Sequence, residues 1–256
     1  MTVSTARCGA RPKQLFNHNT KILPQHVAII MDGNSRWARA RGLPRIAGHK
    51  EGAQSVKRCI EAAINNQTKW LTLYAFSSEN WRRTPQEVLD LTSLLSYYIK
   101  YEARNLHKEG VCVRIIGEIC RFEPKLQKEL HRIQELTKSN TRLVLILALS
   151  YGGRGEVIQA VKQIVQDVKK GAISLDAVDE SLFSNYLFTH NIPDPDLIIR
   201  TSGECRLSNF LLWQSAYSEL IFLETLWPDF KAQDYNEAID MYLQRERRFG
   251  ARPGIK

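Results

Sequence analysis

The sequence predicts an α/β fold: a single domain in which a central, mostly parallel sheet is flanked by helices. Six short apolar, β-branched runs of the kind that form buried strands occur at 26–31, 70–75, 111–116, 142–149, 197–200 and 219–223. Longer segments with helical periodicity separate them, and strands that alternate with helices usually form a parallel sheet. No internal repeat, linker or shift in composition divides the 256 residues, so one domain is the simplest organisation.

The clearest helix start lies after the second of these runs. Thr84 is placed as the N-cap, Pro85 as the first helical residue, and Glu87 completes a capping box. The helix should continue to about residue 107. Nine of the fourteen residues in Val88–Tyr101 are apolar or aromatic, more than a single stripe needs. This helix is therefore either deep in the core, or it packs on the sheet with one face and lines an apolar cavity with another.

The composition favours an anionic partner. The net charge is +9 and the pI about 9.4, which suits nucleic acid, phospholipid or a phosphorylated small molecule, although solubility alone also explains it. The arginines stand singly beside acids and glycines, a pattern that fits compact anions better than nucleic acid. No apolar run is long enough to predict a transmembrane segment. The five scattered cysteines form no C-x-x-C pair, which indicates free thiols in a reducing compartment.

Residues 1–22 are predicted to be a basic tail that precedes a domain at 23–256. The tail contains arginines and lysines and no acid. That composition is typical of the remnant of an organellar transit peptide, and a disordered basic tail explains it equally well.

The stretch IIMDGNSRWARARG, residues 29–42, predicts an anion site. Asp32 ends an apolar run, and the small residues after it let backbone N–H groups approach an anion at a helix start. Arg36 and Arg45 can bind phosphate oxygens in bidentate fashion. One acid among arginines suits a Mg²⁺ ion that bridges to a diphosphate, because magnesium is typically held by one or two carboxylates and substrate phosphates. The alternative is that Asp32 caps the helix and pairs with Arg36.

Two other strands are expected to end in polar side chains. Ser77 and Asn80 follow the second run and can bind a substrate or relay a proton, while Arg200, Arg206 and Ser208 follow the fifth run and suggest a second anion pocket. Ligands of open α/β sheets bind beyond the carboxyl ends of the strands, so these groups should converge. The G-x-x-x-x-G-K-[ST], G-x-S-x-G and H-E-x-x-H motifs are absent.

These stretches together resemble the cis-prenyltransferase family, whose type member is undecaprenyl diphosphate synthase. The resemblance covers about residues 22–250 and rests on HVAIIMDGN-RWA, GH--G, YAFSSENW-R, YGGR, RTSGE-RLSNFLLWQ--YSE and the terminal RRFG. It implies a parallel sheet with an apolar tunnel, usually in a homodimer. It also implies Mg²⁺-dependent joining of prenyl diphosphates such as dimethylallyl and isopentenyl diphosphate.

The resemblance also implies roles for individual residues. Asp32 would organise Mg²⁺, supported by Glu219 as a second metal ligand. The expected catalytic residues are Asp32, Asn34, Ser77 and Asn80. The expected substrate-binding residues are Gly33, Arg36, Trp37, Arg45, His49, Phe76, Trp81, Arg83, Arg200, Arg206, Ser208, Arg248 and Gly250, of which the last two would reach across the dimer.

The expected product is a short chain of about ten carbons. In this family the tunnel limits chain growth, and Tyr97, Tyr98 and Tyr101 would fill it if even one ring points inward. The chain resembles plant members that make lavandulyl diphosphate from two dimethylallyl diphosphates, which implies a location in the plastid stroma, with the cytoplasm as the alternative. The alternatives are regular condensation with isopentenyl diphosphate to neryl diphosphate and, if the tyrosines face the sheet and leave the tunnel open, a longer polyprenyl chain. A non-catalytic scaffold subunit and a nucleic-acid binder are the alternatives from other classes.

Overall fold

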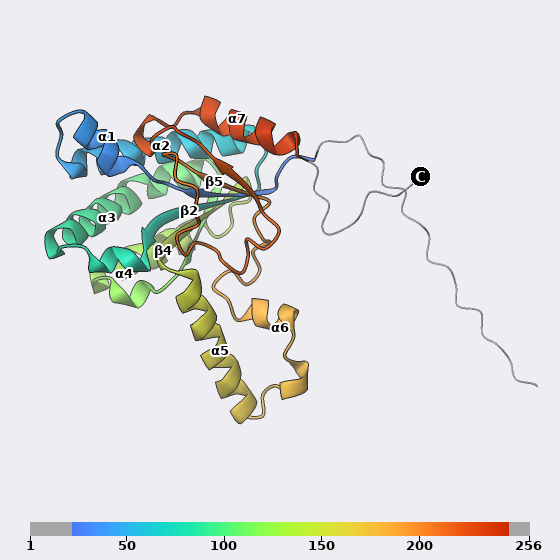
Figure 1. Cartoon of the computed structure of the whole chain (residues 1–256). Helices are drawn as coiled ribbons and strands as arrows, with labels where there is room; N and C mark the ends of the chain where they lie inside the picture. The colour runs from blue at the N-terminus through green and yellow to red at the C-terminus, as the bar shows by residue number, and fades with distance from the viewer. Residues whose placement is uncertain (1–21, 246–256) are drawn as a thin grey trace, which may run out of the picture.

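A parallel sheet of six strands forms the centre of the molecule, in the order β3-β4-β2-β1-β5-β6 (Figure 1). The computed structural model describes residues 22–245, and it confirms the α/β prediction. The strands are β1 (His26–Ile30), β2 (Trp70–Ser77), β3 (Val111–Ile116), β4 (Leu143–Tyr151), β5 (Leu197–Arg200) and β6 (Glu219–Phe222). Each of the six apolar runs thus became a strand.

The helices follow the strands in the alternation that the sequence predicts. They are α1 (Asn34–Ala40), α2 (Arg45–Asn65), α3 (Pro85–Lys108), α4 (Pro124–Thr137), α5 (Gly153–Lys169), α6 (Glu180–Asn185) and α7 (Ala232–Leu243). Short 3₁₀ helices are η1 (Ser78–Arg82), η2 (Ile119–Arg121), η3 (Leu175–Ala177) and η4 (Trp227–Asp229). None of the helices in residues 22–245 is long and apolar enough to cross a membrane.

Both faces of the sheet are covered. Along β1, Val27 and Ile29 belong to one buried cluster, and Ala28 and Ile30 belong to another on the opposite face. The first cluster includes residues of α2, α3, α4 and α7. The second is closed mainly by loop side chains such as Phe210. Burial on both faces explains why the strands read as continuous apolar runs.

The order of the strands reverses around β1. Its neighbours are β2 on one side and β5 on the other, with Ile30 opposite Tyr74 and Arg200. A reversal of this kind leaves a crevice at the carboxyl ends of the two strands, where ligands of doubly wound sheets bind. The residues after β1 and β5 therefore meet at one place.

Helix α3 begins as predicted, with the Thr84 hydroxyl accepting a hydrogen bond from the Glu87 backbone N–H at 3.4 Å. Ile99 is its one fully buried residue, so the deep-core alternative is wrong. The side chains of Tyr97 and Tyr101 are 53% and 58% exposed. The predicted basic tail up to residue 21, and the residues Arg248 and Gly250, lie outside the described residues.

Candidate active site

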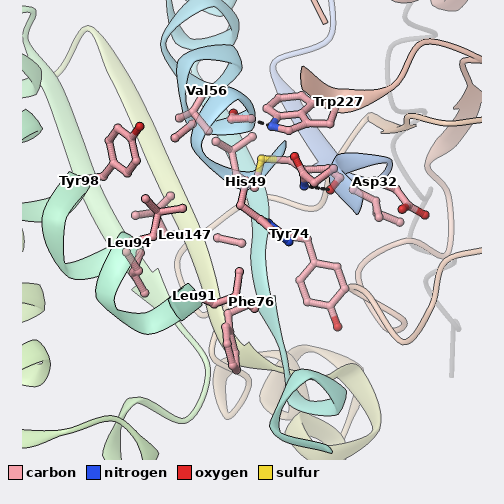
Figure 2. Close-up of a pocket in the computed structure, with 18 of the residues that line it drawn as sticks. Asp32, His49, Val56, Tyr74, Phe76, Leu91, Leu94, Tyr98, Leu147 and Trp227 are labelled. Atoms are coloured by element: carbon pink, nitrogen blue, oxygen red, sulfur yellow. Dashed lines mark hydrogen bonds between the residues drawn. The ribbon is translucent and has the colours of Figure 1, made fainter. Parts of the chain in front are cut away.

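A cavity of about 470 Å³ begins at the carboxyl ends of β1, β2 and β5 and extends between α2 and α3 (Figure 2). Its polar part is lined by Asp32, Gly33, Asn34, Ser35, Arg36, His49, Ser77, Asn80, Arg83, Arg200 and Ser208. Its apolar part includes Val56, Ile60, Leu73, Phe76, Leu91, Leu94, Leu95, Tyr98, Ile99, Leu106, Leu145 and Leu147. Most of the predicted polar residues thus converge on one cavity, as the positions at the strand ends indicated.

Asp32 lies at the centre of the polar part, just beyond β1. One carboxylate oxygen accepts a hydrogen bond from Arg200 Nη2 at 2.8 Å, and the other accepts from the Gly33 backbone N–H at 2.7 Å. Arg36 Nη2 lies 3.6 Å from the second oxygen, so the predicted pairing with Arg36 is present as well. Burial raises the pKa of Asp32, but Arg200, the Gly33 N–H and Arg36 lower it, and the net pKa is below the usual value. The carboxylate is therefore ionised at neutral pH.

Gly33 sets the turn that presents this carboxylate. Its φ is 109°, a region that side chains rarely adopt, and an added Cβ would lie 3.0 Å from Leu226 Cδ2. The residue caps the start of α1, whose first backbone N–H groups lack partners inside the helix. The turn therefore brings a carboxylate and a helix N-terminus to the same side of the cavity.

Arg200, the last residue of β5, holds the loop that follows it. The residue is only 3% exposed. Besides Asp32, its guanidinium donates to Ser208 Oγ at 2.8 Å and to the Arg206 carbonyl. Its Nε has no hydrogen-bond partner. A buried guanidinium needs a counter-charge, and Asp32 supplies it.

The start of α1 packs tightly on α2 through two glycines. An added Cβ at Gly48 would lie 2.0 Å from the Asn34 carbonyl oxygen, and one at Gly52 would lie 2.3 Å from Asn34 Oδ1. Only glycine leaves room for so close an approach, which explains the GH--G spacing. The Asn34 Oδ1 atom is buried and has no hydrogen-bond partner. Asn34 is thus held against α2 at the edge of the cavity.

His49 lines the cavity from inside α2. The helix begins at Arg45, so His49 lies one turn inside it. Burial and the charge of Arg83, partly offset by Glu87, lower its pKa from 6.5 to about 4. The imidazole is therefore neutral at physiological pH and can act as a hydrogen-bond donor and acceptor.

The end of β2 brings Ser77 and Asn80 to the same polar region. The Ser77 backbone N–H donates to Asn80 Oδ1 at 3.0 Å, and the Ser77 side chain caps the first turn of η1. This reciprocal cap fixes both side chains beside the cavity. Phe76, buried just before them, forms part of the apolar wall.

Four of the predicted substrate-binding residues do not line the cavity, and three of them belong to α1, α2 and η1. Trp37 donates its ring N–H to Asp229 at 2.7 Å. Arg45 has a side chain that is 61% exposed and pairs with Glu87. The ring of Trp81 packs against Phe76 with centroids 5.0 Å apart, so it lies beside a residue of the lining and does not line the cavity itself. These residues were predicted because they are close in sequence to site residues, but their side chains do not line the cavity.

Arg206 also lies outside the lining, on the loop that Arg200 holds. Its side chain is 58% exposed and pairs with Glu204. Glu204 in turn lies 3.2 Å from Arg36 Nη2. Arg206 is therefore at the rim of the polar part, linked to it through an acid.

Glu219 is placed at the opposite end of the sheet from Asp32. It is the first residue of β6 and lies beside Leu197, whereas Asp32 follows Ile30, which lies beside Arg200. Its carboxylate pairs with Arg245 Nη1 at 2.7 Å. Within one chain, Glu219 therefore does not complete a metal site with Asp32. No group of three or more metal-binding His, Cys, Asp or Glu side chains is found in residues 22–245.

The polar part of the cavity nevertheless fits a magnesium ion that arrives with its substrate. Among the described residues, Asp32 is the single acid that lines this polar part of the cavity. Magnesium usually keeps several waters and is bound by one or two carboxylates together with substrate phosphates. One carboxylate surrounded by arginines matches that pattern.

Two further groups of the site were not singled out from the sequence. Thr201 Oγ1 accepts from the Asp32 backbone N–H at 2.9 Å and donates to the Asp32 carbonyl at 2.7 Å, so it fixes the backbone at the acid. Its position directly after Arg200 was the available signal. Trp227 of η4 lines the cavity and donates to the Gly52 carbonyl at 2.8 Å, a contact that local sequence does not indicate.

Comparison with known proteins identifies the family. Residues 30–250 match the family described as "Putative undecaprenyl diphosphate synthase". An isoprenyl transferase of Clostridium perfringens is 50% identical over 234 residues, which are 91% of each chain. The ditrans,polycis-undecaprenyl-diphosphate synthase ((2E,6E)-farnesyl-diphosphate specific) of Haemophilus influenzae is 49% identical over 89% of this chain and 95% of its own.

A solved structure has the same fold. Lavandulyl diphosphate synthase from Lavandula x intermedia, in complex with dimethylallyl diphosphate, superposes with a TM-score of 0.87 at 36% identity, over 89% of this chain and 98% of that one. Both sequence relatives above are bacterial and are more similar to this chain than the plant enzyme is. The comparisons thus give no support to a plastid location or to a specifically plant type. The chain belongs to the undecaprenyl diphosphate synthase family of cis-prenyltransferases and is a prenyltransferase.

Proposed function

We propose that this enzyme lengthens an allylic prenyl diphosphate by repeated Mg²⁺-dependent condensation with isopentenyl diphosphate, and that its product is a long polyprenyl diphosphate. The observation that supports this most strongly is the cavity itself, which joins a charged end to a long apolar part between α2 and α3. A prenyl diphosphate has the same division between an anionic head and an apolar chain. The name of the Haemophilus influenzae relative, an undecaprenyl-diphosphate synthase, points the same way.

The number of tyrosine rings in the cavity wall bears on the length of the product. Of the three tyrosines in α3, Tyr98 alone lines the cavity. Tyr97 and Tyr101 are exposed and pack against each other, with ring centroids 4.3 Å apart. Because one inward ring was the condition for a ten-carbon product, the tyrosines do not decide the length, and we favour a long product over lavandulyl or neryl diphosphate on the name of the Haemophilus influenzae relative.

The geometry supports different chemical roles for different residues at the polar end. Cleavage of the allylic C–O bond places negative charge on the departing diphosphate, and Arg36 and Arg200 provide positive charge beside it. Magnesium bound by Asp32 and the diphosphate would further stabilise that charge. The apolar walls exclude water from the allylic fragment. The new bond joins the allylic carbon to isopentenyl diphosphate, which then loses a proton, and Ser77 and Asn80 lie where they can orient this second substrate and relay that proton.

The direct test is incubation of the purified protein with farnesyl diphosphate, radiolabelled isopentenyl diphosphate and Mg²⁺. Dephosphorylated products are then separated by chain length, with a chelator-treated reaction as the control. We expect a series of labelled polyprenols that extends to a long chain. The chelator-treated reaction should give no labelled product. Lavandulol from dimethylallyl diphosphate alone would support the branched C10 alternative. The absence of labelled product with every allylic primer would contradict the proposal.

We further propose that the enzyme acts as a homodimer, with α5 in the interface. In Figure 1 this helix projects away from the sheet, and Ile158, Val161 and Val165 on it are 56%, 45% and 44% exposed. Their spacing places them on one face, and an exposed apolar face of this kind commonly marks a protein interface. Val161→Glu should shift the sedimentation of the protein from dimer to monomer. A wild-type protein that sediments as a monomer at all concentrations would contradict this proposal.

A further inference from the structure

Two charged side chains line the otherwise apolar part of the cavity. Lys57 of α2 and Glu102 of α3 both belong to the lining. Lys57 Nζ lies 2.7 Å from Glu102 Oε1, and the other carboxylate oxygen accepts a hydrogen bond from Asn105 Nδ2 at 3.1 Å. The pair therefore joins α2 to α3 with both carboxylate oxygens engaged.

The pair lies far from the residues that would bind the diphosphate. His49 faces the polar part from α2, and Lys57 follows it two turns later, about 12 Å along the helix axis. On α3, Tyr98 and Glu102 are one turn apart and lie on the same face. Figure 2 shows Tyr98 and Asp32 at opposite sides of the cavity. An apolar chain that grows away from Asp32 would thus meet Tyr98 and then the ion pair.

The pair also separates the cavity from solvent. The side chains of Lys57 and Glu102 are 42% and 23% exposed, so each faces the cavity on one side and water on the other. One turn earlier the Tyr98 hydroxyl donates to the Lys50 carbonyl at 3.2 Å, which links the same two helices. The wall between α2 and α3 is thus closed by polar contacts and not by apolar packing alone.

We propose that the Lys57–Glu102 ion pair is a latch in the wall between α2 and α3 that limits the length of the prenyl chain. This inference rests on the proposed function. A chain that reaches the pair must either separate the two charges or strip water from them, and both cost free energy. Further addition then becomes less favourable than release of the product. Without the latch, the helices can part and the chain can extend toward solvent.

The test is the chain length of the products made by full-length Lys57→Ala/Glu102→Ala from farnesyl diphosphate and labelled isopentenyl diphosphate. We expect the ratio of longer products to the main wild-type product to rise about tenfold. The rate of the first addition should stay near that of the wild type, because the pair is remote from Asp32. The charge-reversed variant Lys57→Glu/Glu102→Lys restores the pair and should restore the wild-type lengths.

A matched control is available at the exposed C-terminal end of α4. Lys138 and Glu135 form an ion pair of the same 2.7 Å length, away from the cavity, and their double alanine variant should leave product lengths unchanged. If the Lys57/Glu102 alanine variant fails to fold, Glu102→Gln removes the charge with little change in shape and should lengthen the products in the same direction.

Unchanged product lengths in a folded Lys57/Glu102 variant would overturn the latch and leave the proposed function intact. A wild-type enzyme that adds no isopentenyl diphosphate would instead contradict the proposed function, and the latch with it.

Discussion

The two ends of the cavity are built in different ways. At the polar end, Asp32 lies just beyond β1 and Arg200 ends the adjacent strand β5, and the sheet register brings them together at 2.8 Å. At the apolar end, the wall depends on which faces of α2 and α3 turn toward each other, and it is closed by Tyr98 and the Lys57–Glu102 pair. The groups that do chemistry are fixed by backbone hydrogen bonds, whereas the space for the chain is set by side chains.

This difference implies that rate and product length can be changed independently. A parallel sheet has little freedom to shift, because its strands are buried on both faces and paired along their length. A helix that is half exposed, like α3, can move relative to its neighbour at lower cost. Changes at the polar end should therefore alter turnover, and changes at the apolar end should alter which product is made.

The largest expected effect is that of Asp32→Asn. The substitution removes the carboxylate that would hold magnesium and leaves the buried Arg200 without a full counter-charge. We expect kcat to fall about 100-fold or more, and the free energy of unfolding to fall by about 1–3 kcal/mol. Turnover of labelled isopentenyl diphosphate and thermal melting measure the two effects.

Asp229→Asn is the matched control for this change. Asp229 also pairs with an arginine, Arg41, at 3.3 Å, but it lies on the surface and outside the cavity. The variant should keep activity and stability near the wild-type values. Equal losses in the two variants would mean that Asp32 is merely structural.

The next comparison separates the two arginines of the loop after β5. The Arg200 side chain is 4% exposed, whereas that of Arg206 is 58% exposed. Arg200→Gln breaks a buried pair and should destabilise the fold by about 3 kcal/mol. Arg206→Gln should cost less than about 1 kcal/mol and should mainly raise KM. Chemical denaturation and steady-state kinetics of both variants check this, and similar denaturation midpoints would contradict it.

The apolar end can be tested with two neighbouring tyrosines. Tyr98 lines the cavity and Tyr97 does not, although they are adjacent in the same helix. Tyr98→Ala should shift the products toward longer chains, because it enlarges the cavity and removes a link to α2. Tyr97→Ala should leave the chain lengths unchanged. A shift of the same size in both variants would show that the change acts through α3 as a whole.

The smallest expected effect is a dependence of stability on pH. Burial lowers the pKa of both His49 and His26 from 6.5 to about 4. The unfolded chain therefore binds more protons between these values, so stability should fall as the pH drops from 6.5 to 4 and be insensitive to these groups above 6.5.

The two histidines differ in what a ligand can do to them. His26 is enclosed at the amino end of β1, and its ring nitrogens are hydrogen-bonded to the Pro193 carbonyl and the Thr72 hydroxyl. His49 faces the polar part of the cavity, where a bound diphosphate would favour its charged form. Inorganic diphosphate should thus raise the pKa of His49 and leave that of His26 unchanged in an NMR titration. Equal responses would place the anion elsewhere.

The sequence was most informative where function depends on the residues directly after a strand. Asp32, Ser77 and Arg200 could be placed together because parallel strands end at one edge of the sheet. The capped start of α3 was equally readable, since Thr84 and Glu87 interact locally. In these cases neighbours in sequence, or a simple sheet geometry, decide the position.

The parts that sequence could not supply depend on contacts between distant elements. The crowded helix α3 gave no indication which of its tyrosines faces the cavity, because packing against α2 selects the face. Glu219 was expected near Asp32, yet the register places it at the far end of β6. The Lys57–Glu102 pair joins two helices that are separated by a strand, and neither residue stands out in its own segment.

The central claim is that the polar end of the cavity sets the rate and the apolar end sets the chain length. Its most direct test measures rate and product length together in Asp32→Asn and Tyr98→Ala. We expect Asp32→Asn to lose nearly all turnover while its residual products keep the wild-type lengths. We expect Tyr98→Ala to make longer products while the first addition proceeds within about threefold of the wild-type rate. If either variant changed rate and chain length together, the separation of chemistry from chain length would be contradicted.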